Sequence, residues 1–120
     1  MTVVNSNMTI GNAGLINADL IINQGCSRSF TVIHEDDEGN IIDHTGSIGT
    51  IAIEKGNFIK KFNGAVSCGA SAIAVTIDAN DTKNLSLGEY DWDLIVRMTS
   101  GEVIRLIYGI ATVTDTYALD

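Results

Sequence analysis

Proline is absent from this 120-residue chain, and basic residues are few. Seven lysines and arginines stand against fifteen acidic residues, which gives a formal net charge of −8. Binding to a phosphate backbone or to an anionic membrane surface needs clustered cations, so this composition argues against both partners. No apolar run approaches the ~20 residues that cross a bilayer, and the first residues lack a basic signal-peptide region. We therefore expect a soluble protein that is made in the cytoplasm.

Cysteine is also scarce, and Cys26 and Cys68 are the two thiols of the chain. Neither has a second cysteine or a suitably spaced histidine nearby that would indicate zinc. We expect two reduced, largely buried thiols rather than a disulfide, because a reducing compartment of synthesis disfavours the bond. The chain lacks a glycine-rich phosphate loop, a nucleophile elbow and a catalytic cysteine signature. The sequence therefore predicts neither a cofactor nor an enzyme.

Isoleucine, valine and threonine are plentiful and lie in short alternating runs that glycines separate. β-Branched residues suit a half-buried pleated surface, and short runs between turn signals are typical of a sandwich or barrel. The pattern predicts an all-β fold, an immunoglobulin-like antiparallel β-sandwich of about seven to eight strands. We expect this domain over residues 18–120 and an extended N-terminal arm over residues 1–17.

Several segments carry more specific predictions. The run 47–55 should place Ile51 and Ile53 in the core, and 58–66 should be an edge strand that its paired lysines protect. Residues 79–88 are expected to form no more than a turn or two of helix. Residues 89–98 and 103–113, joined by a tight turn with Gly101, predict an antiparallel hairpin.

Asp91 and Asp93 lie one residue apart beside Trp92, the single tryptophan of the chain. Residues i and i+2 of a strand share a face with Cα atoms ~6.5–7 Å apart, close to the ~5–9.5 Å that separates glycosidase carboxylates. A general acid, however, needs burial in apolar surroundings, and here Tyr90 and Trp92 alternate onto the opposite face. We expect the aromatic side chains in the core and both aspartates outside, so a small hydrolase built on them is the weakest hypothesis.

Arg97 shares the outward face with the two aspartates, and Arg105 lies on the partner strand. Cross-strand ion pairs there could serve only to fix the strand register, at ~0.2–1 kcal/mol each. The same face could instead contact another subunit. The sequence leaves these two interpretations open.

The stretch from His34 to His44 gathers potential metal ligands around a turn. It does not match a helix-flanked calcium loop, which needs acids at alternating positions and a distal glutamate. The two histidines could meet across a hairpin, with Asp36 or Asp43 as a third ligand, but no pattern fixes that geometry. We interpret the stretch as a solvated acidic turn, with residues 40–43 returning as a hairpin arm, and predict no metal site.

Three stretches carry a resemblance to a known group: LIINQG, SFTVIHEDDEGNIIDHTG, and AIAVTIDANDTKNLSLGEYDWDLIVRMTSGEVIRLIYGIATVT. Their motifs are D-x-x-G-N-x-I-D-x-T-G, L-x-x-G-x-Y-x-x-D-L and G-x-V-x-R-L-x-x-G-x-x-x-V. Over about residues 20–114 the chain resembles small immunoglobulin-like structural proteins of tailed bacteriophages, and it is similar to the N-terminal domain of phage upper baseplate proteins. The chain departs from them in its proline-free end and in its N-terminal extension.

The resemblance implies a virion component in a tail, baseplate or neck, or a capsid decoration, present as a homo-oligomer among other virion proteins. It implies no catalytic residue. A carbohydrate- or cell-surface-binding module on the same fold, with Trp92 or Tyr108 exposed, is the alternative. The arm is too poor in apolar residues to fold alone but could add to a neighbour's sheet edge, or it could be a frayed terminus. The candidate protein-contact residues are Val3, Val4, Met8, Ile10, Asp91, Asp93 and Arg97.

Overall fold

The computed structural model describes residues 3–11 and 15–116. This part of the chain forms ten strands and one helical turn. In chain order they are β1 (Asn7–Ile10), β2 (Ile16–Asn17), β3 (Leu20–Asn23), β4 (Arg28–His34), β5 (Ile48–Lys55), β6 (Phe58–Lys61), β7 (Val66–Cys68), β8 (Ile73–Ile77), α1 (Ala79–Thr82), β9 (Gly88–Arg97) and β10 (Val103–Thr114). No helix of the described ranges is long and apolar enough to cross a membrane.

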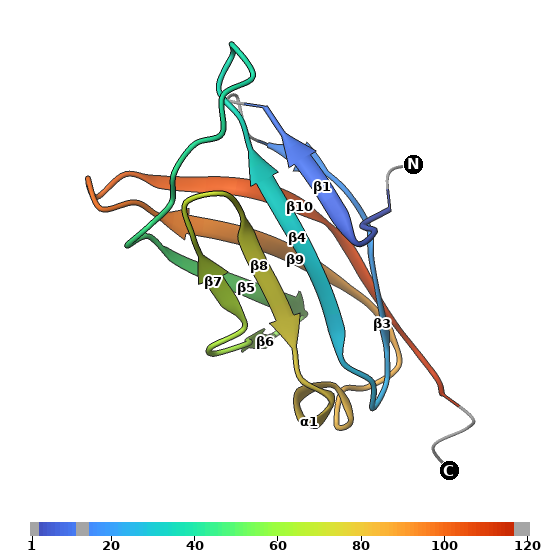
Figure 1. Ribbon diagram of the computed structural model, residues 1–120. Coiled ribbons are helices and arrows are strands. Elements are labelled where there is room, and N and C mark those ends of the chain that lie inside the picture. The colour runs from blue at the N-terminus through green and yellow to red at the C-terminus, as the bar shows by residue number, and fades with distance from the viewer. Residues whose placement is uncertain (1–2, 12–14, 117–120) are drawn as a thin grey trace.

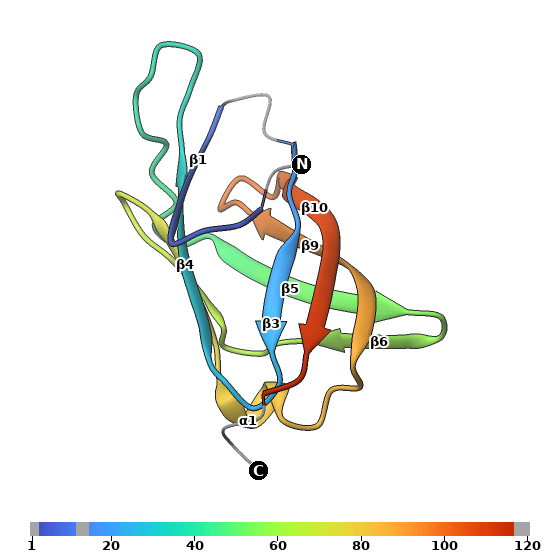
Figure 2. The same ribbon diagram turned by 90° about the vertical axis from the view of Figure 1, so that its right-hand side faces the viewer.

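The strands form two sheets that pack face to face. One has the order β1-β4-β8-β7, and the other has the order β2-β10-β9-β5-β6 with β3 also paired to β10. Figure 1 shows β4, β8 and β7 in front of β10, β9 and β5, and Figure 2 shows the two layers from the side. In immunoglobulin terms β4, β8 and β7 take the places of strands B, E and D, while β6, β5, β9 and β10 take those of C′, C, F and G. The predicted all-β, immunoglobulin-like sandwich is confirmed.

Strand direction differs from the prediction at the N-terminus. From β4 onward neighbouring strands are antiparallel, and these include the predicted β9–β10 hairpin. In contrast, β1 runs parallel to β4, and both β2 and β3 run parallel to β10. Both sheets are therefore mixed, which corrects the expectation of a purely antiparallel sandwich. The physical reason is that the N-terminal segment lies along both sheets instead of extending away from them.

The core follows the two-residue periodicity of the strands. Ile51 and Ile53 are buried as predicted, and β8 buries Ile73, Val75 and Ile77 while its other residues face solvent. Strand β6 lies at an edge of its sheet, again as predicted. Alternate burial leaves one apolar face on each sheet, and these two faces meet to form a single core.

Two contacts of β9 reproduce features of the immunoglobulin core. The Tyr90 hydroxyl donates a hydrogen bond to the carbonyl of Ser86, 2.8 Å away, at the turn before β9. This is the tyrosine corner, in which a tyrosine near the start of strand F bonds back to the preceding turn. Two residues further on, Trp92 packs edge-on against Phe30 of β4 with ring centroids 6.3 Å apart. The aromatic pair links the two sheets at the strands that a disulfide joins in antibody domains.

Strand β10 approaches the N-terminal segment closely at Gly109. A Cβ at this position would overlap the carbonyl oxygen of Ala18 and lie 2.8 Å from its carbonyl carbon. The close approach lets the Ala18 amide donate to the Tyr108 carbonyl at 2.9 Å and the Trp92 indole donate to the Ala18 carbonyl at 2.9 Å. Glycine is therefore required here for space.

Candidate functional site

The sheet that contains β9 presents a mixed charged and aliphatic surface to solvent, which we call the outer face. Cross-strand register places its residues in rows: Glu54 beside Asp91, Ala52 beside Asp93, and Ile48 beside Arg97. The neighbouring strands β6 and β10 complete the rows. The members of the outer face are Ile48, Thr50, Ala52, Glu54, Ile59, Lys61, Glu89, Asp91, Asp93, Ile95, Arg97, Val103, Arg105, Tyr108, Ile110 and Thr112.

The structure places the sequence-predicted residues Asp91, Asp93 and Arg97 together on this face. Trp92 is only 2% exposed, so the aromatic side chains of β9 lie in the core as predicted. Arg105 donates to Asp93 across the β9–β10 pair, with 3.2 Å between Nε and Oδ2. Both side chains are partly exposed, so this pair contributes only ~0–1 kcal/mol. This is one of the cross-strand ion pairs that the sequence allowed.

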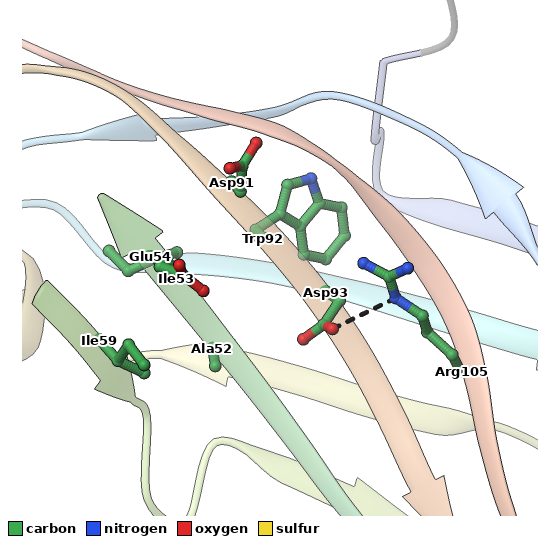
Figure 3. Close-up of a pocket in the computed structure, with 8 residues that line it drawn as sticks. All are labelled: Ala52, Ile53, Glu54, Ile59, Asp91, Trp92, Asp93 and Arg105. Carbon is green, nitrogen blue, oxygen red and sulfur yellow. Dashed lines mark hydrogen bonds and ion pairs between the residues drawn. The ribbon is translucent and has the colours of Figure 1, made fainter. Parts of the chain in front are cut away.

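A shallow hollow of about 210 Å³ lies on the outer face. Figure 3 shows the side chains of Glu54, Asp91 and Asp93 around the small side chain of Ala52, with Ile59 at one side and Arg105 at the other. The aspartates face solvent and one of them is held by an arginine, so neither lies in the apolar pocket that a general acid needs. The hollow offers a place for a side chain rather than a catalytic cleft.

His34 and His44 form a second cluster, which differs from the expected solvated turn. Both are buried, and His34 Nδ1 lies 3.0 Å from His44 Nε2, with the rings nearly parallel. One nitrogen donates and the other accepts, so the contact is compatible with two neutral rings or with a pair in which only one ring is positively charged. Burial lowers the pKa of His44, nearby His34 lowers it further, and Asp43 acts in the opposite direction.

The loop between β4 and β5, residues 35–47, projects at the top of Figures 1 and 2. Its tip is solvated as predicted, since Asp37 and Glu38 are exposed. The Asp36 carboxylate accepts hydrogen bonds from the backbone amides of Asn40 and Glu38. These bonds lower the pKa of Asp36, and the bond from Asn40 has the largest effect. The expected hairpin arm over residues 40–43 is reduced to a single bridge between Glu35 and Ile41. The histidines at the base of the loop are buried together and give this irregular segment its anchor.

The described residues hold no group of three or more His, Cys, Asp or Glu side chains placed to bind a metal ion. The third ligand considered beside the histidines, Asp36 or Asp43, is instead engaged at the surface by backbone amides of its own turn. Cys26 and Cys68 are free and partly buried. Burial raises the pKa of the Cys68 thiol, so this side chain is a poor metal ligand and a poor nucleophile at neutral pH.

The N-terminal candidate residues are used mainly within the chain itself. Val4 and Ile10 are buried in the core, and Met8 is half-buried against it. The Val4 amide donates to the Asp19 carbonyl at 2.7 Å. The prediction that Val4 and Ile10 contact a partner is therefore corrected, because their side chains already fill the sandwich. Val3 remains exposed.

The sequence did not identify the part of the outer face that β5 and β6 contribute. Glu54 and Ala52 share an alternating run, so their common face could be predicted, but their position beside Asp91 and Asp93 depends on the β5–β9 pairing. The signal that could have found it is the predicted sandwich topology itself, in which strands C and F are neighbours.

No protein-family model matches the chain, and no curated protein matches it. Among solved structures, the chain is similar to the N-terminal domain of phage TP901-1 ORF48, with a TM-score of 0.55 and 13% identity over 89% of this chain and 98% of that one. It also aligns with murine CRIg over 82% of this chain and 92% of that one, at 7% identity and a TM-score of 0.37. The likeness to the phage domain shows the fold. The TM-score of the alignment with CRIg is too low to indicate a shared fold.

Proposed function

We propose that the chain is a non-enzymatic structural protein of a tailed-phage particle. It acts through protein–protein contacts as a tail, baseplate or neck component or as a capsid decoration. The observation that carries the proposal is the likeness to the phage TP901-1 ORF48 domain, which spans 89% of this chain and 98% of the other. Nearly the whole sandwich therefore corresponds to a domain that comes from a phage.

The surface chemistry supports contacts with proteins rather than a reaction. Aliphatic side chains such as Ile48 and Ile59 are more than half exposed on the outer face, beside unburied carboxylates. The chain carries a net charge of −8, which disfavours nucleic acid and anionic membranes as partners. The carbohydrate-binding alternative receives no support from Trp92, which is buried, while Tyr108 is half-buried under the Arg105 guanidinium, 4.9 Å from its ring centroid.

The direct test is to look for the chain in purified particles. Lysates of cells that release phage would be banded on a density gradient, and the particle fraction would be analysed by mass spectrometry and by immunogold labelling. We expect the chain to band with the particles at a fixed copy number and to label one location on them. A chain that is abundant in the lysate but absent from the particles would contradict the proposal, and so would a gene placed in a metabolic operon far from portal, capsid and tail genes.

A further inference from the structure

The outer face carries a charge pattern that fits a second copy of the same chain. We propose that two chains associate through this face, around a two-fold axis that lies in the plane of the interface and perpendicular to β9. The proposal goes beyond the phage role, because it names one surface and one partner. Its test uses the purified chain alone, so that its failure and the failure of the virion assignment are distinguishable.

The charges of the outer face are nearly balanced. Glu54, Glu89, Asp91 and Asp93 supply four negative charges, and Lys61, Arg97 and Arg105 supply three positive ones. The face thus has a formal charge of −1, and most of the net charge of −8 belongs to the rest of the chain. Two copies would repel each other at a uniformly acidic surface but not at this one.

The order of these charges along the strands is complementary under a two-fold rotation. Glu54 and Asp91 share the row at one end of the β5–β9 pairing, and Arg97 lies in the row at the other end, ~20 Å away at the rise of a strand. Within the described residues, the single ion pair is that of Arg105 with Asp93, so neither Asp91 nor Arg97 has an ion-pair partner among them. The proposed axis runs between the rows of Asp93 and Ile95. It places Asp91 of each copy opposite Arg97 of the other.

The shape of the outer face selects the same arrangement. Ile48 is 66% exposed and lies in the Arg97 row, while the hollow of about 210 Å³ lies on the same strand pair near the Asp91 row. The two-fold axis that joins Asp91 to Arg97 also brings Ile48 of one copy over the hollow of the other. The hollow is smaller than the ~300 Å³ at which pockets for small ligands begin, which suits a single aliphatic side chain. A contact that repeats itself in this way is isologous and closes at two copies.

The size of the surface sets the expected strength. Four strands spaced ~4.8 Å apart and about seven rows spaced ~3.4 Å apart cover roughly 450 Å² per copy. The total, about 900 Å², lies below the ~1,200 Å² at which stable specific interfaces begin, so we expect a weak, reversible dimer rather than a permanent one. Such a dimer is expected to have a Kd on the order of micromolar and to be detectable by its dependence on concentration.

The experiment is sedimentation equilibrium of the purified chain from about 5 to 500 µM, a range chosen to bracket that Kd. The wild type should shift from a monomer of 12.8 kDa toward twice that mass. Asp91→Arg and Arg97→Asp should each raise the Kd by at least about tenfold, because each places like charges opposite one another twice in the dimer. The combined variant exchanges the two charges and should recover association to within a few fold of the wild type.

Ile48→Asp tests the hollow independently, since this exposed side chain can be replaced without disturbing the core. It should also weaken association by at least about tenfold. The matched controls are Asp37→Arg and Ile41→Asp, which make the same changes at exposed positions of the 35–47 loop and should leave the Kd unchanged. Emission from the buried Trp92 verifies that each variant is folded.

Three results would overturn the proposal. The first is a wild type that stays monomeric at the highest concentration. The second is a charge-exchanged variant that remains as weak as the single variants, because the two residues then do not oppose one another. The third is a loop control that weakens association as much as its outer-face counterpart.

Discussion

A single added methyl group at Gly109 should destabilise the sandwich strongly. In Gly109→Ala the new Cβ would overlap the Ala18 carbonyl oxygen and lie 2.8 Å from its carbonyl carbon. Contacts this short do not occur between real atoms, so the segment that joins β2 to β3 must move away from β10. The obstacle is backbone on both sides, and no side chain can rotate to relieve it.

The magnitude follows from what that movement breaks. Two hydrogen bonds depend on the position of Ala18, one from its amide to the Tyr108 carbonyl and one to its carbonyl from the Trp92 indole. Each contributes ~0.5–1.5 kcal/mol, and overpacking in a close-packed interior costs ~1–3 kcal/mol. The free energy of unfolding should therefore fall by ~2–6 kcal/mol, a large part of the ~5–15 kcal/mol typical of a domain.

The assay is urea unfolding followed by the fluorescence of the single tryptophan, which itself loses a hydrogen-bond acceptor in the variant. Gly11→Ala is the matched control: a Cβ there meets nothing within 4 Å, and the residue is exposed. Its free energy of unfolding should stay within ~1 kcal/mol of the wild type, with a tendency to rise as the unfolded chain becomes less flexible. A Gly109→Ala protein within ~1 kcal/mol of the wild type would refute the account of the close approach.

Three further predictions concern the corner, the histidine pair and a thiol. Tyr90→Phe removes the hydrogen bond to the Ser86 carbonyl and should lower the free energy of unfolding by ~0.5–1.5 kcal/mol in urea titrations, and an unchanged value would contradict a structural role for the corner. Burial, and to a lesser extent His34, lower the pKa of His44 in the folded chain, so as the pH falls the unfolded chain takes up a proton at this residue before the folded chain does. The free energy of unfolding should therefore be constant above pH ~6.5 and fall as the pH drops below it. His44→Gln should flatten that fall, and a wild type equally stable at pH 7 and 5 would argue against the shift. Burial raises the pKa of Cys68, so its alkylation at pH 8 should be much slower in the folded chain than in urea, and equal rates would exclude burial as the cause.

Local periodicity was sufficient to predict much of the fold. A two-residue alternation decides which side chains face the core wherever one side of a strand is buried, and Ile51, Ile53 and Trp92 lie where the pattern puts them. The same rule places Asp91 and Asp93 outside. These predictions succeed because each depends on one strand and on the difference between apolar and polar side chains.

Predictions failed where the outcome depends on distant partners. The parallel pairing of Ile16 with Ile107 joins residues about ninety positions apart, and strand β2, which has two residues, contains no local sign of it. The burial of His34 and His44 was missed because it depends on their contact with each other. Each histidine supplies a hydrogen-bond partner for a ring nitrogen of the other, and the sequence around either residue alone does not predict burial. The hollow on the outer face likewise exists only once β5 and β9 are side by side.

The position of β10 has a consequence for how the chain is made. This strand lies between β9 and the strands β2 and β3, so β2 and β3 have no neighbour in that sheet until β10 has been synthesised. Pairings of such long sequence separation are slow to form, because the chain loses loop-closure entropy before the contacts between the strands can offset that loss. Completion of the sheet therefore waits for β10, the last of its strands in chain order. A nascent chain cut before residue 103 would leave β9 as an unpaired edge open to aggregation.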